Sequence, residues 1–267
     1  MKVIQRIIIL GVALFIISVG IVYAVLKQAD TSEDEGSQLD PLLQQEVREK
    51  LQNFRMLKLI RQRGLILKKE NFTQISNYQK YVTPNNSTVQ LYLTTNAINT
   101  SQQAYASAVN WIWVSDSTLH GKLENWLLPA EFISDTPTNP DNPVPGNMVS
   151  DCESQAYTLA SLIEALGTSK SNVRVVVGEV NFSGEIGGHA WVQLYQNGQW
   201  FELEATSGPY WDDDDLELVN NIGFSYSFFK TRPYPVVEYW AYFNDRYYYN
   251  PDTGMKSLDL PSHWLTN

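Results

Sequence analysis

Three residues of this chain carry the groups that a thiol enzyme uses, and each lies in a distinct sequence context. Cys152 is the only cysteine among 267 residues and lies in the segment SDCE. His189 follows in GGHAW, and Glu204 lies in WFELEAT. A thiol nucleophile needs a base that takes its proton and a third group that orients this base. We therefore take Cys152, His189 and Glu204 as a candidate catalytic set.

The segment around Cys152 predicts the start of a helix. Ser150 and Glu153 match the S-x-x-E capping box, and Gly167 follows as a stop signal. Between them, apolar residues recur at helical spacing: Ala156, Leu159, Ala160, Ile163 and Leu166. With Ser150 as N-cap, Cys152 is the second helical residue, where the helix dipole lowers a thiol pKa and free N–H groups can hold an oxyanion. The spacing leaves open the alternative that Cys152 only begins a core helix.

The segment between His189 and Glu204 predicts a hairpin. Asn197-Gly198 separates two alternating runs, which is typical of a two-residue type I′ turn. This turn pairs Val192 with Leu203 and leaves one face of both strands entirely apolar. On the opposite face, it places His189 opposite Thr206 and Glu204 as a diagonal neighbour of His189. Such neighbours are about 7–8 Å apart at the backbone, a distance that side chains bridge.

Taken together, these segments resemble the core of the transglutaminase-like superfamily, which is related to papain in topology. The resemblance covers roughly residues 126–208. It includes the cysteine motif, the strand VRVVVG at 173–178, the GGHAWV histidine motif and the acid motif W-x-x-LEAT at 200–206. Upstream, WLLPAE at 126–131 resembles the W-x-x-P-x-E of microbial members. Two departures occur, because the family usually has Asp-Pro-Thr where this chain has Glu204, Ala205 and Thr206.

The resemblance implies a fold and a set of roles. The fold is α+β, with a cysteine-bearing helix packed on an antiparallel sheet that carries His189 and the acid. Cys152 would be the nucleophile, His189 the general base and acid, and Glu204 the group that orients the imidazole. Trp126 and Trp191 are further candidates for the oxyanion site or substrate binding. For Trp126, a role as a core aromatic residue is the alternative. The aromatic stretch 234–249 is expected to extend the sheet or to line the groove.

The N-terminus predicts a membrane anchor. Residues 7–26 form an uncharged apolar run that would span roughly 30 Å as a helix, the thickness of a bilayer. Lys2 and Arg6 precede this run, and an acidic segment follows it. The positive-inside rule then puts the N-terminus in the cytoplasm and the remainder outside the cell membrane, as a single-pass protein. A cleaved signal peptide is the alternative, but the run is long and lacks a small-x-small site.

The predicted organisation has four parts: a cytoplasmic stub and transmembrane helix (1–27), an acidic linker (28–40), an amphipathic helix (41–64) and the extracytoplasmic domain (65–267). The net charge is −10, and the charges before residue 28 are all positive. The body after the anchor therefore repels phosphate backbones, which argues against a nucleic-acid partner.

We expect a membrane-anchored thiol enzyme that transfers acyl groups from amide or peptide bonds. Its partner is a protein or peptide substrate, and the reaction ends either in hydrolysis (protease or amidase) or in transamidation (transglutaminase). The alternative is a catalytically silent binding or scaffold module of the same fold. No cofactor is implied. Calcium binding by the acidic run 212–215 is a weaker idea, and a solvated acidic turn explains this run equally well.

Overall fold

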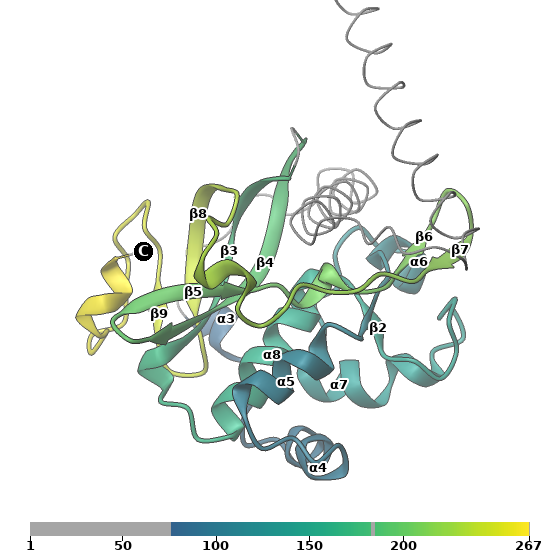
Figure 1. Ribbon diagram of the computed structural model, residues 1–267, viewed down its shortest axis with the longest axis horizontal. Coiled ribbons are helices and arrows are strands. Elements are labelled where there is room, and N and C mark those ends of the chain that lie inside the picture. Colours follow the sequence, from purple (N-terminus) through teal and green to yellow (C-terminus); the bar gives the residue numbers. More distant parts are fainter. Residues whose placement is uncertain (1–75, 183–184, 267) are drawn as a thin grey trace, which may run out of the picture. The chain divides into compact units, whose positions relative to one another are not determined.

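The computed structural model describes residues 76–182 and 185–266 (Figure 1). The helices of this part are α3 (Ser76–Gln79), α4 (Ser87–Thr95), α5 (Ser101–Ala108), α6 (Asp116–His120), α7 (Pro129–Ser134) and α8 (Cys152–Ala165). The strands are β1 (Ile112–Trp113), β2 (Val149–Ser150), β3 (Val173–Phe182), β4 (Glu185–Gln196), β5 (Gln199–Leu203), β6 (Tyr210–Asp212), β7 (Glu217–Val219), β8 (Val236–Phe243) and β9 (Tyr248–Tyr249). The mixed α+β class agrees with the expectation from the sequence.

The predicted anchor, linker and amphipathic helix all lie outside the described residues. Within 76–182 and 185–266, no helix combines the length and the apolar character needed to cross a bilayer. The extracytoplasmic location therefore stays a prediction.

An antiparallel sheet of order β5-β4-β3-β8-β9 forms one layer of the fold. The predicted hairpin register is confirmed, because Val192 pairs with Leu203 and Gln196 with Gln199. Asn197 and Gly198 have φ angles of +54° and +86°, as a type I′ turn requires. The strand β5 nevertheless ends at Leu203. The predicted pairing of His189 with Thr206 is therefore wrong, and Glu204 reaches His189 from a turn rather than from a ladder.

The aromatic C-terminal stretch does extend the sheet. Strand β8 pairs with β3 and β9 pairs with β8. The β3–β8 register shifts beside Gly178, which lies opposite His189. A Cβ at Gly178 would lie only 2.2 Å from the carbonyl oxygen of Glu238. Glycine is needed here because two backbones approach each other closely on the strand next to the candidate histidine.

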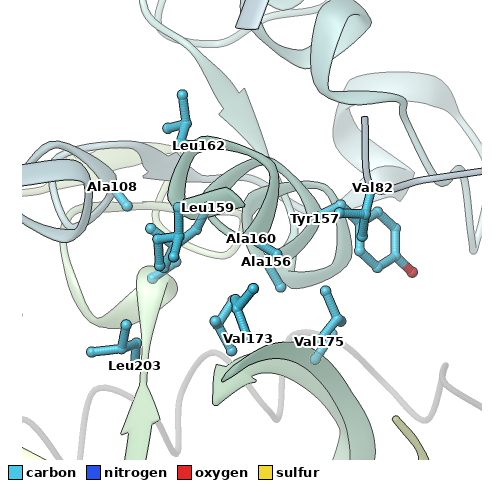
Figure 2. Packing of buried hydrophobic residues seen from close by; sticks show 14 of the residues in the cluster. Val82, Ala108, Ala156, Tyr157, Leu159, Ala160, Leu162, Val173, Val175 and Leu203 are labelled. Atoms are coloured by element: carbon cyan, nitrogen blue, oxygen red, sulfur yellow. The ribbon is translucent and has the colours of Figure 1, made fainter. Parts of the chain in front are cut away.

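The helix α8 packs across one face of this sheet and is buried along nearly its whole length (Figure 1). Figure 2 shows the side chain of Ala156 on the side of α8 that faces two valines of β3, Val173 and Val175. Alanines on this face let the helix approach the sheet closely. Gly167, with a φ of +88°, follows the helix end as predicted.

The predicted capping box is wrong. Ser150 belongs to β2, where it pairs with Trp113 of β1, so its backbone is part of a sheet. The N-cap is Asp151, which makes no side-chain capping hydrogen bond, and Cys152 is the first helical residue rather than the second. Pairing with Trp113, which lies far from Ser150 in the sequence, therefore outweighs the local preference of Ser150 for the N-cap position. This small sheet, of order β2-β1-β6-β7, holds the start of α8.

The far end of α8 contains a buried carboxyl group, Glu164. Burial raises its pKa to about 9, the charge of Asp245 adds to this effect, and Lys170 opposes it. At pH values between 4.5, the ordinary pKa of a glutamate, and about 9, Glu164 is protonated in the native state and ionised in the unfolded chain. The contribution of Glu164 to the free energy of unfolding must therefore fall as the pH rises through this window.

We expect Glu164→Gln to remove this loss, because an amide occupies the same volume without a charge. The Tm at pH 8 should rise, by roughly 2–4 °C for each kcal/mol of destabilisation relieved. The difference from the wild type should shrink as the pH approaches 5. Thermal unfolding followed by circular dichroism across this pH range measures both effects. The matched control is Glu217→Gln at an exposed carboxylate. Equal pH profiles for Glu164→Gln and the wild type would contradict the assignment.

Candidate active site

The Glu204 carboxylate lies at the centre of the candidate site, directly after β5. It is the N-cap of a short 3-10 turn, η4 (Ala205–Ser207), and is fully buried. Its Oε1 accepts hydrogen bonds from the backbone N–H of Thr206 at 3.0 Å and from the Thr206 hydroxyl at 2.7 Å. Its Oε2 lies 2.6 Å from Nε2 of His189. The predicted proximity of His189 and Glu204 is confirmed.

The second contact of Oε2 is Tyr234, whose hydroxyl donates to it at 2.5 Å. Burial alone would raise the pKa of Glu204. The charge of His189 and the hydrogen bonds from His189, Tyr234 and Thr206 outweigh that effect and lower the pKa to about 2. Glu204 is therefore an anion at neutral pH. Sequence reasoning did not find Tyr234, because a residue thirty positions after the acid carries no local signal for this contact.

The Cys152 sulfur lies beside the strand that carries the histidine. The backbone N–H of Ala190, the residue after His189, donates to Sγ at 3.3 Å. The partner strand β5 stops opposite Val192, so this N–H lies beyond the last pair of the β4–β5 ladder. The structure thus brings all three predicted residues into one buried region, with Cys152 at the first position of α8.

This arrangement favours a thiolate and a directed proton transfer. The first N–H groups of a helix have no partners within the helix, and their dipoles stabilise negative charge. The Ala190 N–H adds one more dipole directed at the sulfur. When His189 donates its Nε2 proton to Glu204, Nδ1 is the nitrogen that can accept a proton. The imidazole ring is held in place by Trp191, whose ring lies 6.0 Å away at an interplanar angle of 16°.

The two weaker candidates are both packed among aromatic rings. Trp191 is fully buried, and its ring lies 4.9 Å from that of Tyr234. The indole N–H of Trp126 donates to Glu124 at 2.9 Å, and its ring contacts Tyr157 of α8. Trp191 belongs to a buried aromatic cluster, whereas Trp126 is partly buried and packs against the core around α8. The contacts of Trp126 fit the alternative considered for it, an aromatic residue of the core.

One group of carboxylates near Cys152 has a ligand set that could hold a metal ion. Oxygens of Asp116, Glu124 and Asp151 all lie within 4.8 Å of one another. Oxygen ligands of this kind suit calcium or magnesium. The same carboxylates also accept hydrogen bonds from the protein, including those from the Asn125 N–H and the Trp126 indole. Acidic groups often gather without an ion, so the cluster alone does not define a metal site.

The acidic run 212–215 is explained by contacts within the protein. Asp212 is buried and accepts hydrogen bonds from the N–H groups of Asp214 and Asp215. The carboxylate of Asp213 accepts hydrogen bonds from the hydroxyls of Ser115 and Thr118. These bonds tie the β6–β7 turn to the start of α6, and the burial of Asp212 departs from the expected solvated turn.

The site thus belongs to a mixed α+β fold in which a helix supplies a cysteine and the adjoining sheet and turn supply a histidine and a carboxylate.

No family model matches the chain. No curated protein matches it either. Among solved structures, the chain is similar to Legionella pneumophila LapG in its calcium-bound form, with 14% identity over 61% of this chain and 74% of that one, at a TM-score of 0.39. The EGTA-treated form gives 13% identity over 59% and 69%, at a TM-score of 0.38. A likeness at this level carries no conclusion about activity.

The geometry predicts how the reactivity of Cys152 depends on pH. In the wild type, we expect the rate of alkylation by iodoacetamide to be nearly constant between about pH 6 and 8, because His189 stabilises the thiolate. In His189→Asn, the rate should rise with pH over this range, because the thiolate has lost its cationic partner. Because Cys152 is the only cysteine, mass spectrometry reports on this site alone.

Burial of the sulfur slows the reagent in both proteins, and the same chain covers the sulfur in both. The comparison therefore separates activation from access. Parallel pH profiles for the wild type and His189→Asn would show that the imidazole does not act on the thiol.

Proposed function

We propose that this chain is a thiol-dependent acyl-transfer enzyme that acts on amide or peptide bonds. Cys152 is the nucleophile, His189 the general base and acid, and Glu204 the orienting carboxylate. The observation that carries this proposal is the buried contact between His189 and Glu204, next to the Ala190 N–H that binds the Cys152 sulfur. Three groups of complementary chemistry meet there, although Cys152 and Ala190 are 38 positions apart in the sequence.

In the first half of the reaction, the Cys152 thiolate attacks the carbonyl carbon of the substrate. The C–S bond forms, and the carbonyl oxygen takes the negative charge of a tetrahedral intermediate. The backbone N–H groups in the first turn of α8 lie at the positive end of the helix dipole and are suited to stabilise that charge. The intermediate collapses when the C–N bond breaks, and the imidazolium of His189 gives its proton to the departing amine. The product is a thioester on Cys152.

In the second half, a nucleophile resolves the thioester. His189, now neutral, takes a proton from water or from a primary amine as this nucleophile attacks the thioester carbonyl. Water yields a carboxylic acid, whereas an amine yields a new amide. In both cases the thiolate leaves and the imidazolium re-forms, which restores the starting state. Throughout the cycle, ionised Glu204 stabilises the charged imidazole and fixes its orientation.

A catalytically silent binding module of the same fold is the second candidate. It is favoured by the burial of the reacting groups, because Cys152 is fully enclosed and only 1% of His189 is exposed. A substrate can reach the sulfur only if the chain that covers it moves. Enzyme and silent module therefore differ in whether such an opening occurs, and turnover decides between them.

We expect the wild type to release ammonia or an amine from glutamine-containing peptides, and Cys152→Ala to abolish this release. Adding a primary amine separates the two outcomes of the thioester. An isopeptide product detected by mass spectrometry would contradict a purely hydrolytic enzyme, whereas a product 1 Da heavier than the glutamine peptide would indicate hydrolysis. Cys152→Ser serves as the isosteric control for folding. Equal product formation by the wild type and Cys152→Ala would reject Cys152 as the nucleophile.

We also propose that residues 7–26 anchor the enzyme in the cell membrane, with residues 28–267 on the outer side. The support is the length of the uncharged apolar run and the positive charges of Lys2 and Arg6 before it. An anchored enzyme acts on substrates at the membrane surface, which restricts them to secreted or surface-exposed proteins and peptides.

The anchor has a direct test in membranes from an expression host. The full-length chain should stay with the membrane pellet after alkaline carbonate extraction and enter solution only with detergent. Replacing Leu14 and Ile17 by arginine should release it, because charges at the bilayer centre oppose insertion. A wild-type chain that carbonate extracts, or that has lost its N-terminus to signal cleavage, would overturn the anchor.

A further inference from the structure

The Tyr234 hydroxyl shares one carboxylate oxygen with the candidate catalytic histidine. Both Tyr234 and Nε2 of His189 contact Oε2 of Glu204, at 2.5 and 2.6 Å. The other oxygen, Oε1, is already occupied by two donors from Thr206. We propose that Tyr234 is a positioning residue, which holds Oε2 against the imidazole and limits how strongly this carboxylate binds the imidazolium. The catalytic consequence of this inference rests on the proposed function.

The Tyr234 segment is built to hold this hydroxyl in place. Prolines 233 and 235 flank the tyrosine and restrict the backbone on both sides. The carbonyl of Pro235 accepts a hydrogen bond from the N–H of Asn181 at 2.7 Å, which fastens the segment to β3. The ring itself is packed against Trp191 and Phe229, with centroids at 4.9 and 4.8 Å. The hydroxyl is therefore oriented before any substrate binds, at little further entropic cost.

The direction of the hydrogen bond follows from the electrostatics. Burial raises the pKa of Tyr234 well above its ordinary value, and the negative charge of Glu204 raises it further. The phenol is therefore a donor at neutral pH, and Glu204 is the acceptor. The ionisable groups around this pair come from several elements: His189 on β4, Glu202 on β5, Cys152 on α8 and Tyr105 on α5.

Two donors on one oxygen compete with each other. A carboxylate oxygen that binds the phenol has less charge to offer the imidazolium, so each bond is weaker in the presence of the other. Tyr234 thus has two effects on His189. It fixes the position of the oxygen that orients the imidazole, and it keeps the imidazolium able to give up its proton to the leaving amine. A residue that only filled space beside Trp191 would have neither effect.

The experiment compares Tyr234→Phe with the wild type by NMR of ¹⁵N-histidine-labelled full-length protein. Without the competing phenol, the Nε2–H bond of His189 to Glu204 should strengthen, and its proton resonance should move downfield. Placing 3-fluorotyrosine at position 234 makes the phenol more acidic and should move the resonance upfield, with the fold retained. The control is Tyr239→Phe, which removes a hydroxyl from a ring that also packs on Trp191. It should leave the resonance unchanged.

Kinetics add a second, independent measurement. The kcat of Tyr234→Phe should fall about tenfold, which is what a hydrogen bond to a charged group is worth. KM should change little, and the alkaline limb of the kcat/KM profile should move to higher pH. A structural role would lower the Tm without moving the resonance or the limb. An unchanged resonance in both Tyr234 variants would overturn the inference. Because NMR needs no turnover, this failure is distinguishable from the absence of enzyme activity.

Discussion

The candidate site depends on one buried negative charge, the carboxylate of Glu204. An ionised carboxyl group inside a protein is strongly destabilising unless donors replace the water that it has lost. Here the donors come from three separate parts of the chain: the strand with His189, the turn with Thr206, and the segment with Tyr234. Any change that removes one of them leaves a charge less well compensated. The hairpin, the turn and the C-terminal segment are therefore linked energetically through a single side chain.

The parts of this site that the sequence could predict are those specified by local patterns. The Asn197-Gly198 turn and the alternation of apolar residues determine the register of β4 and β5 without reference to any other segment. That register brings His189 and the turn that carries Glu204 to the same end of the hairpin. The stop at Gly167 is likewise a local signal, because glycine adopts the left-handed conformation without strain.

The parts that the sequence could not predict depend on contacts between distant segments. Ser150 looked like an N-cap because its neighbours match the capping box, yet it pairs with Trp113 in a sheet. Nothing near either residue indicates this pairing, since a strand of two residues has no periodicity. Tyr234 is a similar case. One tyrosine in an aromatic stretch gives no sign that its hydroxyl, rather than that of Tyr239, contacts Glu204.

The glutamate at position 204, where the motif that the sequence resembles has aspartate, has a structural reason in this chain. Strand β5 ends at Leu203, so the acid caps the turn η4 and its two oxygens bind partners on different elements. One oxygen caps the turn at Thr206 while the other reaches across to β4, and the longer side chain makes both possible. The absence of a proline at Ala205 matters little for the same reason. The capping bond uses the N–H of Thr206, so the backbone N–H of residue 205 takes no part in holding the carboxylate.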